Sequence, residues 1–138
     1  MTAFRKTVLF AKSLKACAPL AWALILAGCS AKIPDVSSAD FAQIVDHVTV
    51  GGIDRPQEWT LSSAQIALLA AWLSAHSTGW TTKFEDTAPG VEIYLRRSRV
   101  NFAYVNIHPE FVQIGDAYRD LSSDERARLE AIIKNESG

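Results

Sequence analysis

The chain has 138 residues, with 14 Lys and Arg, 15 Asp and Glu, and two cysteines. All fifteen acidic residues lie after residue 29, against ten basic ones, so this part carries a net side-chain charge of −5. Such a balance argues against nucleic-acid binding, which requires a basic surface. The same part contains no cysteine, which excludes from it a disulfide and a cysteine-ligated metal site.

The N-terminal segment has the layout of a secretion signal. Four basic side chains and no acidic one fall within the first fifteen residues, and an uncharged run then extends from Ala16 to Leu26. A basic region, a short apolar run and small residues at its end are typical of a secretory signal peptide. The apolar run is shorter than the about 20 residues of a membrane-spanning helix.

The signal ends in Leu26-Ala27-Gly28-Cys29. This stretch resembles the lipobox of bacterial lipoproteins, in which an aliphatic residue, a small residue and Gly or Ala precede a cysteine. The resemblance implies diacylglycerol on the Cys29 sulfur and cleavage between Gly28 and Cys29. In that family an Asp after the cysteine tends to retain the protein in the inner membrane. Ser30 stands there, so the resemblance implies an outer-membrane anchor facing the periplasm.

The expected organisation is a cleaved signal over residues 1–28, a lipidated cysteine with a flexible tether over residues 29–39, and one periplasmic domain over residues 40–138. The tether is expected because the segment is small and polar and is interrupted by Pro34. A chain of this length after cleavage can bury roughly 65% of its unfolded surface, which suits a single domain.

Within the domain, the pattern first predicts a strand near Ile44–Val50, ended by Gly51-Gly52, and a loop over Asp54–Trp59 that contains Pro56. A helix is then predicted over Ser63–Ala75. Ser62 and Gln65 have the spacing of a capping box, and apolar residues recur at helical spacing after them.

Four strand-like runs follow, and a second capping box then starts the last helix, formed by Ser122 and Glu125. The order of strand, helix, four strands and helix predicts an α+β fold, an antiparallel sheet of about five strands with two helices packed on it. The four runs cover Trp80–Phe84, Val91–Arg96, Val100–Ile107 and Phe111–Ile114, the last reaching towards Tyr118 with a bend at Gly115.

None of the familiar hydrolase signatures occurs in the chain. Asp46 and His47 would point to opposite faces of a strand, and His76 would cap the first helix. The sequence therefore favours a protein that is not an enzyme and needs no cofactor or metal. The alternative is an envelope-polymer binder or hydrolase that uses His108, Glu110 or Asp116.

We expect instead that the domain binds a protein in the periplasm, as an inhibitor of the immunity type or as an accessory factor of an envelope assembly. Exposed aromatic residues and arginines are typical of such interfaces. The expected protrusions are the loops Gly51–Trp59 and Asp86–Gly90 and the turn Arg96–Arg99. The expected partner-binding residues are Arg55, Trp59, Arg96, Arg97 and Arg99.

Overall fold

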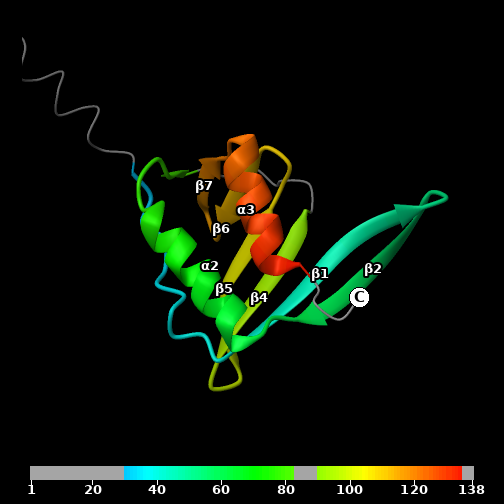
Figure 1. Cartoon of the computed structure of the whole chain (residues 1–138), viewed down its shortest axis with the longest axis horizontal. Helices are drawn as coiled ribbons and strands as arrows, with labels where there is room; N and C mark the ends of the chain where they lie inside the picture. The colour runs from blue at the N-terminus through cyan, green and yellow to red at the C-terminus, as the bar shows by residue number, and fades with distance from the viewer. Residues whose placement is uncertain (1–29, 83–89, 135–138) are drawn as a thin grey trace, which may run out of the picture.

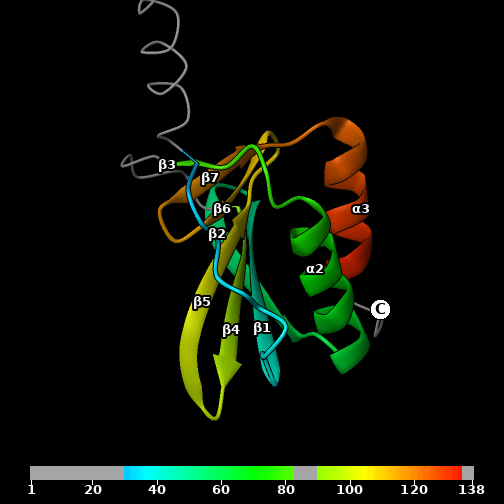
Figure 2. The ribbon, with the colours of Figure 1, turned by 90° about the vertical axis from the view of Figure 1, so that its left-hand side faces the viewer.

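Seven strands form one antiparallel sheet, and both helices lie on the same face of it (Figures 1 and 2). The computed structural model describes residues 30–82 and 90–134. The predicted α+β class is confirmed, with more strands than the about five expected. Across the sheet the strands run in the order β2-β1-β4-β5-β6-β7-β3. The elements are β1 (Phe41–Val50), β2 (Ile53–Thr60), α2 (Ser63–Ala75), β3 (Thr81–Thr82), β4 (Val91–Arg97), β5 (Val100–Ile107), β6 (Phe111–Ile114), β7 (Ala117–Asp120) and α3 (Ser123–Ile133).

The first hairpin corrects the sequence prediction. The loop expected over Asp54–Trp59 belongs to strand β2, which pairs with β1 along its whole length. Gly51 and Gly52 form the turn, with φ of +62° and +80°. Positive φ at both central residues is the conformation of a type I′ turn, which matches the twist of a hairpin. Figure 1 shows the end of this hairpin projecting beyond the rest of the domain.

Pro56 favoured the prediction of a loop because proline is rare in strands. It is tolerated here because β2 is at the edge of the sheet. In a two-residue hairpin, the residue pair beside the turn is hydrogen bonded. Pairs without and with hydrogen bonds then alternate along the ladder. Pro56 faces His47 in a pair without hydrogen bonds, so its nitrogen points to the open edge. The ladder with β1 therefore stays intact, while the edge loses one donor.

Two of the other strands differ in extent or number from the sequence prediction. The run Trp80–Phe84 contributes the short strand β3 (Thr81–Thr82), and residues 83 and 84 lie outside the described part. The expected last strand is two strands, β6 and β7, joined by a turn at Gly115, which has a φ of +58°. A glycine in this conformation reverses the chain here rather than bending one strand.

Both predicted capping boxes are present. The Ser62 hydroxyl accepts from the Gln65 amide at 3.2 Å, and the Gln65 side chain accepts from the Ser62 amide at 3.0 Å. Ser122 and Glu125 make the equivalent pair of bonds at 3.3 and 2.8 Å. These reciprocal bonds satisfy donors that a helix start leaves without partners. Helix α2 accordingly covers Ser63–Ala75, as predicted.

The two capping boxes also join the antiparallel helices to each other. The side chain of Gln65 is buried, and its Nε2 donates to the carbonyl oxygens of Ile132 and Lys134, at the end of α3, at 2.8 and 3.0 Å. At the other end, the Glu125 carboxylate lies 3.4 Å from Nε2 of His76, the C-cap of α2. Each helix start thus contacts the end of its neighbour, which fixes the helix layer over the sheet.

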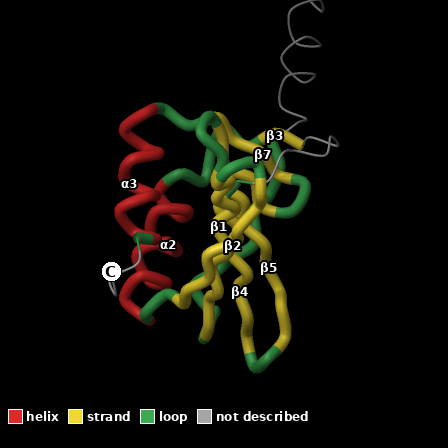
Figure 3. Tube along the Cα trace, turned by 90° about the vertical axis from the view of Figure 1, so that its right-hand side faces the viewer, coloured by secondary structure: helices red, strands yellow, loops and turns green. Residues whose placement is uncertain are grey.

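The two faces of the sheet differ in chemistry. The face under the helices is apolar, and strand residues such as Ile44, Ile93 and Val105 are fully buried there. On the opposite face lies neither of the two described helices (Figure 3). We call it the open face. By strand register it includes Phe41, Gln43, Val45, His47, Glu92, Tyr94, Arg96, Tyr104, Asn106, Gln113 and Tyr118.

The segment expected to be a tether packs on the domain. The Ala31 amide donates to the Trp80 carbonyl at 3.1 Å, and Ile33 contacts the core. Val36 is 2% exposed and is part of the core itself. This segment has no helix or strand, yet it is held along the side of the sheet (Figure 2). Among the described residues no helix is long and apolar enough to cross a bilayer.

Candidate binding surface

Arg96, Arg97 and Arg99 gather at the turn between β4 and β5, as the sequence predicted for a polar hairpin tip. We call these three residues with Ser98 the arginine turn. The Arg96 guanidinium lies over the Phe41 ring, 5.2 Å from its centroid, and that of Arg97 lies 5.1 Å from the centroid of Phe102. Such cation–π contacts hold the guanidinium planes in place without neutralising them.

The arginines make hydrogen bonds to neutral groups. Nε of Arg96 donates to the Asn101 side chain at 2.8 Å, and Nη1 of Arg97 donates to the Ser38 hydroxyl at 3.1 Å. Within residues 30–82 and 90–134, no carboxylate is within ion-pair distance of the three guanidinium groups. The closest acidic contact of this turn is made by its backbone, since the Ser98 amide donates to Asp40 at 2.8 Å. The positive charge is therefore available to a partner.

The backbone of this turn is strained. Ser98 and Arg99 have φ of 50° and 70°. Residues other than glycine rarely adopt this left-handed region, which costs about 1–2 kcal/mol each. Such strain clusters at functional sites, where the surrounding structure maintains it.

Arg55 lies far from the arginine turn. It is exposed on β2 and pairs with Val48, whereas Arg96 pairs with Phe41 at the other end of β1. Seven residue steps along the strand separate Val48 from Phe41, which corresponds to roughly 23 Å. The structure therefore does not bring Arg55 together with the other expected partner-binding arginines.

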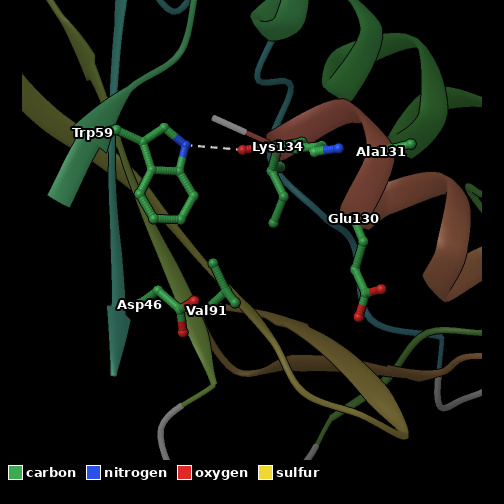
Figure 4. A pocket seen from close by; sticks show the side chains of 7 residues that line it. Asp46, Trp59, Val91, Glu130, Ala131 and Lys134 are labelled. Carbon is green, nitrogen blue, oxygen red and sulfur yellow. Dashed lines mark hydrogen bonds between the residues drawn. The ribbon is translucent and has the colours of Figure 1, made fainter. Parts of the chain in front are cut away.

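Trp59 is on the helix side of the sheet rather than on an exposed loop. Its indole Nε1 donates to the Ile133 carbonyl at 2.9 Å, and its ring lines a pocket of about 400 Å³ (Figure 4). Because the polar atom of the ring is already bonded to α3, Trp59 serves to dock that helix. The pocket is lined by Asp46, Trp59, Val91, Glu130, Ala131, Ile133 and Lys134.

The centre of the open face is a hydrogen-bonded cluster around Glu92. The hydroxyls of Tyr94 and Tyr104 both donate to its carboxylate at 2.8 Å. Nε2 of His47 lies 3.6 Å from the same carboxylate, and its Nδ1 lies 3.0 Å from Asp54. A polar cluster of this kind connects strands β1, β2, β4 and β5 on the open face.

The cluster shifts the pKa values of its members. The hydrogen bond to Asp54 raises the pKa of His47, and the Glu92 carboxylate adds to this effect. Burial alone would raise the pKa of Glu92, but hydrogen bonds from Tyr94, Tyr104 and His47 bring it below its ordinary value. Burial and the bond to Glu92 raise the pKa of Tyr104. The carboxylate stays ionised and the phenol stays neutral at physiological pH, which favours a stable structural cluster over acid–base exchange.

The residues of the hydrolase alternative are separated. His108 and Glu110 are in the turn before β6, and Asp116 is in the turn after it. The four residues of β6 between these turns span roughly 13 Å. The His108 ring stacks on Phe111 at 4.3 Å, and its Nδ1 is buried without a partner in the described part of the chain.

The partners of His47 were not foreseen from the sequence. Asp46 lies on the opposite face, as alternation predicts, while Asp54 and Glu92 belong to neighbouring strands. Gly51-Gly52 could have predicted Asp54 as a partner of His47. A two-residue turn at these glycines places Thr49 opposite Asp54, and His47 is then the diagonal neighbour of Asp54.

Residues 30–82 and 90–134 contain no group of three or more His, Cys, Asp or Glu side chains that could hold a metal ion. Cys29 and most of the expected loop Asp86–Gly90 lie outside the described residues. No protein-family model, curated protein or solved structure matches this chain.

Proposed function

We propose that this chain is a lipid-anchored protein of the bacterial outer membrane whose periplasmic domain binds an acidic surface of a partner protein through the arginine turn. The observation that carries the proposal is the cluster of Arg96, Arg97 and Arg99. These three cations lie at one end of the domain, with Arg96 and Arg97 on opposite faces of β4, and they have no carboxylate partner among the described residues. The partner would be an enzyme if the domain is an inhibitor, or a structural protein if it is an accessory factor.

The chemistry of arginine supports this partner. A planar guanidinium binds a carboxylate through two parallel hydrogen bonds, which gives geometry as well as charge. The aromatic rings under Arg96 and Arg97 hold the side chains, so less conformational entropy is lost when a partner binds. The part of the chain after residue 29 is otherwise acidic, so an acidic partner would be attracted to this end and repelled from the rest.

The anchor is supported by the lipobox Leu26-Ala27-Gly28-Cys29. Replacing Cys29→Ser removes the sulfur that would carry the diacylglycerol. We expect this variant to accumulate as an unprocessed precursor that takes up no labelled fatty acid. Unchanged processing would contradict the anchor.

The partner is tested with a domain of residues 30–138 immobilised and exposed to a detergent-solubilised envelope, with bound proteins identified by mass spectrometry. The test variant carries Arg96→Gln, Arg97→Gln and Arg99→Gln. The matched control carries Arg55→Gln and Arg128→Gln, two exposed arginines elsewhere on the domain. We expect the test variant to bind the identified partner about tenfold more weakly or worse, since interface arginines often contribute more than about 1 kcal/mol.

The control should retain the partner. Equal loss in both variants would indicate non-specific attraction and would contradict the proposed site. Retention of a glycan polymer instead of a protein would favour the alternative of an envelope-polymer binder.

A further inference from the structure

We infer that the end of the domain around β3 lies directly against the bilayer, and that the arginine turn projects away from the membrane at the opposite end. This orientation rests on the proposed lipid anchor at Cys29. It follows from the way in which the chain after that cysteine is held by the domain.

The first contacts of the chain come immediately after the anchor. The amide of Ala31 donates to the Trp80 carbonyl at 3.1 Å, next to β3. Ile33 packs against the core, and Val36 is 2% exposed. These contacts fix the segment to the domain, so it cannot act as a long flexible spacer.

The remaining reach is short. One residue, Ser30, separates Cys29 from Ala31. Two residue steps span at most about 7 Å in an extended chain. A cysteine with several acyl chains is held at the lipid surface, because each buried methylene contributes about 0.8 kcal/mol. The domain end at Trp80 therefore lies within about 10 Å of the headgroup region.

The surface at this end suits lipid headgroups. Ser77, Thr78, Thr81 and Thr82 are exposed and carry hydroxyl groups, and Lys32 is exposed on the docked segment. Residues 77–82 include no acidic side chain, and the acidic neighbour of β3 is the exposed Asp116, which precedes the β7 residue that pairs with Thr82. Hydroxyl and ammonium groups donate hydrogen bonds to phosphate oxygens, and a cation is attracted to an anionic leaflet. The partner of this surface is accordingly a phospholipid bilayer.

The arginine turn is at the other end of the sheet. The docked segment runs along the domain until the Asp40 amide donates to the Arg96 carbonyl at 3.0 Å (Figure 2). Strand β5 has eight residues and leads away from the arginine turn, so the turn projects roughly 26 Å from the far end of that strand. A periplasmic partner would meet the arginine turn first.

The orientation is tested with the processed, lipidated chain in liposomes of phosphatidylethanolamine and phosphatidylglycerol that contain a nickel-chelating lipid. Single nitroxide labels are attached at Ser77→Cys, near the anchor, or at Val100→Cys, beside the arginine turn. Both residues are exposed, and the acylated Cys29 leaves the introduced thiol as the one that reacts. We expect the headgroup nickel to enhance relaxation of the label at residue 77 several-fold more than at residue 100.

A matched control inserts about ten Gly and Ser residues between Ser30 and Ala31, which creates a flexible spacer. We expect the difference between the two labels to disappear in this variant. Equal relaxation at both positions without the insertion would overturn the orientation while leaving the anchor intact. Failure of the chain to float with the liposomes would overturn the anchor itself, and flotation is measured separately from relaxation.

Discussion

The β1–β2 and β4–β5 hairpins turn with the same backbone geometry but with different residues. Gly51 and Gly52 adopt φ of +62° and +80° without a side chain, whereas Ser98 and Arg99 adopt φ of 50° and 70° with one. The glycine turn relieves the steric cost of this conformation, and the arginine turn retains it. The two turns thus differ in whether the conformation carries a steric cost, and this cost falls on the turn through which we propose that the domain binds its partner.

The largest effect is expected when the first turn is given the residues of the second. The double change Gly51→Ser with Gly52→Arg should lower the free energy of unfolding by about 2–3 kcal/mol, since each residue must adopt the left-handed region. Among the described residues, and apart from the two chain neighbours, no heavy atom lies within 4 Å of a Cβ built at either glycine, so the cost arises from the backbone conformation. Chemical denaturation measures the change. An unchanged midpoint would show that the turn adapts and that the two turns are not comparable.

The reciprocal change should have a smaller effect of opposite sign. Ser98→Gly with Arg99→Gly relieves strain but loses conformational entropy on folding, so we expect a gain of about 1 kcal/mol. The same variant should bind the partner more weakly, because Arg99 is absent. Thermal unfolding and the binding assay together test this opposition of stability and function. A loss of stability would contradict the strain that we assign to this turn.

The contact between Asp40 and the arginine turn should contribute less. Asp40 accepts from the Ser98 amide at 2.8 Å and is exposed. The variant Asp40→Asn keeps an oxygen acceptor but loses the charge, and we expect a decrease of about 0.5 kcal/mol in the free energy of unfolding. Asp35→Asn is a matched control on the same segment, where the carboxylate accepts from the Ser37 amide. Equal effects of both variants would show that the turn gains nothing particular from Asp40.

The smallest effect is expected on the pH dependence of stability, to which the first hairpin contributes through His47. The pKa of His47, on the first hairpin, is raised above 6.5 by Asp54 and then by Glu92. A raised pKa in the folded state stabilises the protein below pH 6.5, and this contribution is lost as the pH rises through the shifted value. Unfolding curves from pH 6 to 8 should therefore show a decline that is reduced in His47→Gln. Arg96 pairs with Phe41, at the other end of β1 from His47, so Arg96→Gln should leave the decline in place.

Local signals in the sequence were sufficient for the helices and for the arginine turn. Ser62 with Gln65, and Ser122 with Glu125, each form within four residues the contacts that start a helix. The alternation on either side of Ser98 likewise placed the arginines at a hairpin tip. These features depend on neighbours in the chain, which a pattern can capture.

The features that were missed depend on neighbours in space. Pro56 reads as a loop residue unless its strand is known to be at the sheet edge. Trp59 reads as an exposed aromatic until the end of α3 is known to lie over it. The docked segment reads as a spacer because the buried residue, Val36, stands among small and polar ones. None of these placements follows from local propensity, since tertiary packing decides each of them.

Pro56 has a further consequence under the lipid anchor that we propose, which would confine the protein to a membrane plane. Lipid-anchored copies diffuse in two dimensions with their domains at one height, so their sheet edges meet far more often than they would in free solution. An edge strand with all its donors would allow copies to pair edge to edge and to extend the sheet from one molecule to the next. The missing donor at Pro56 interrupts that edge in the middle of β2. Pro56, which made β2 resemble a loop in the sequence, would thus also keep a dense layer of anchored molecules from polymerising.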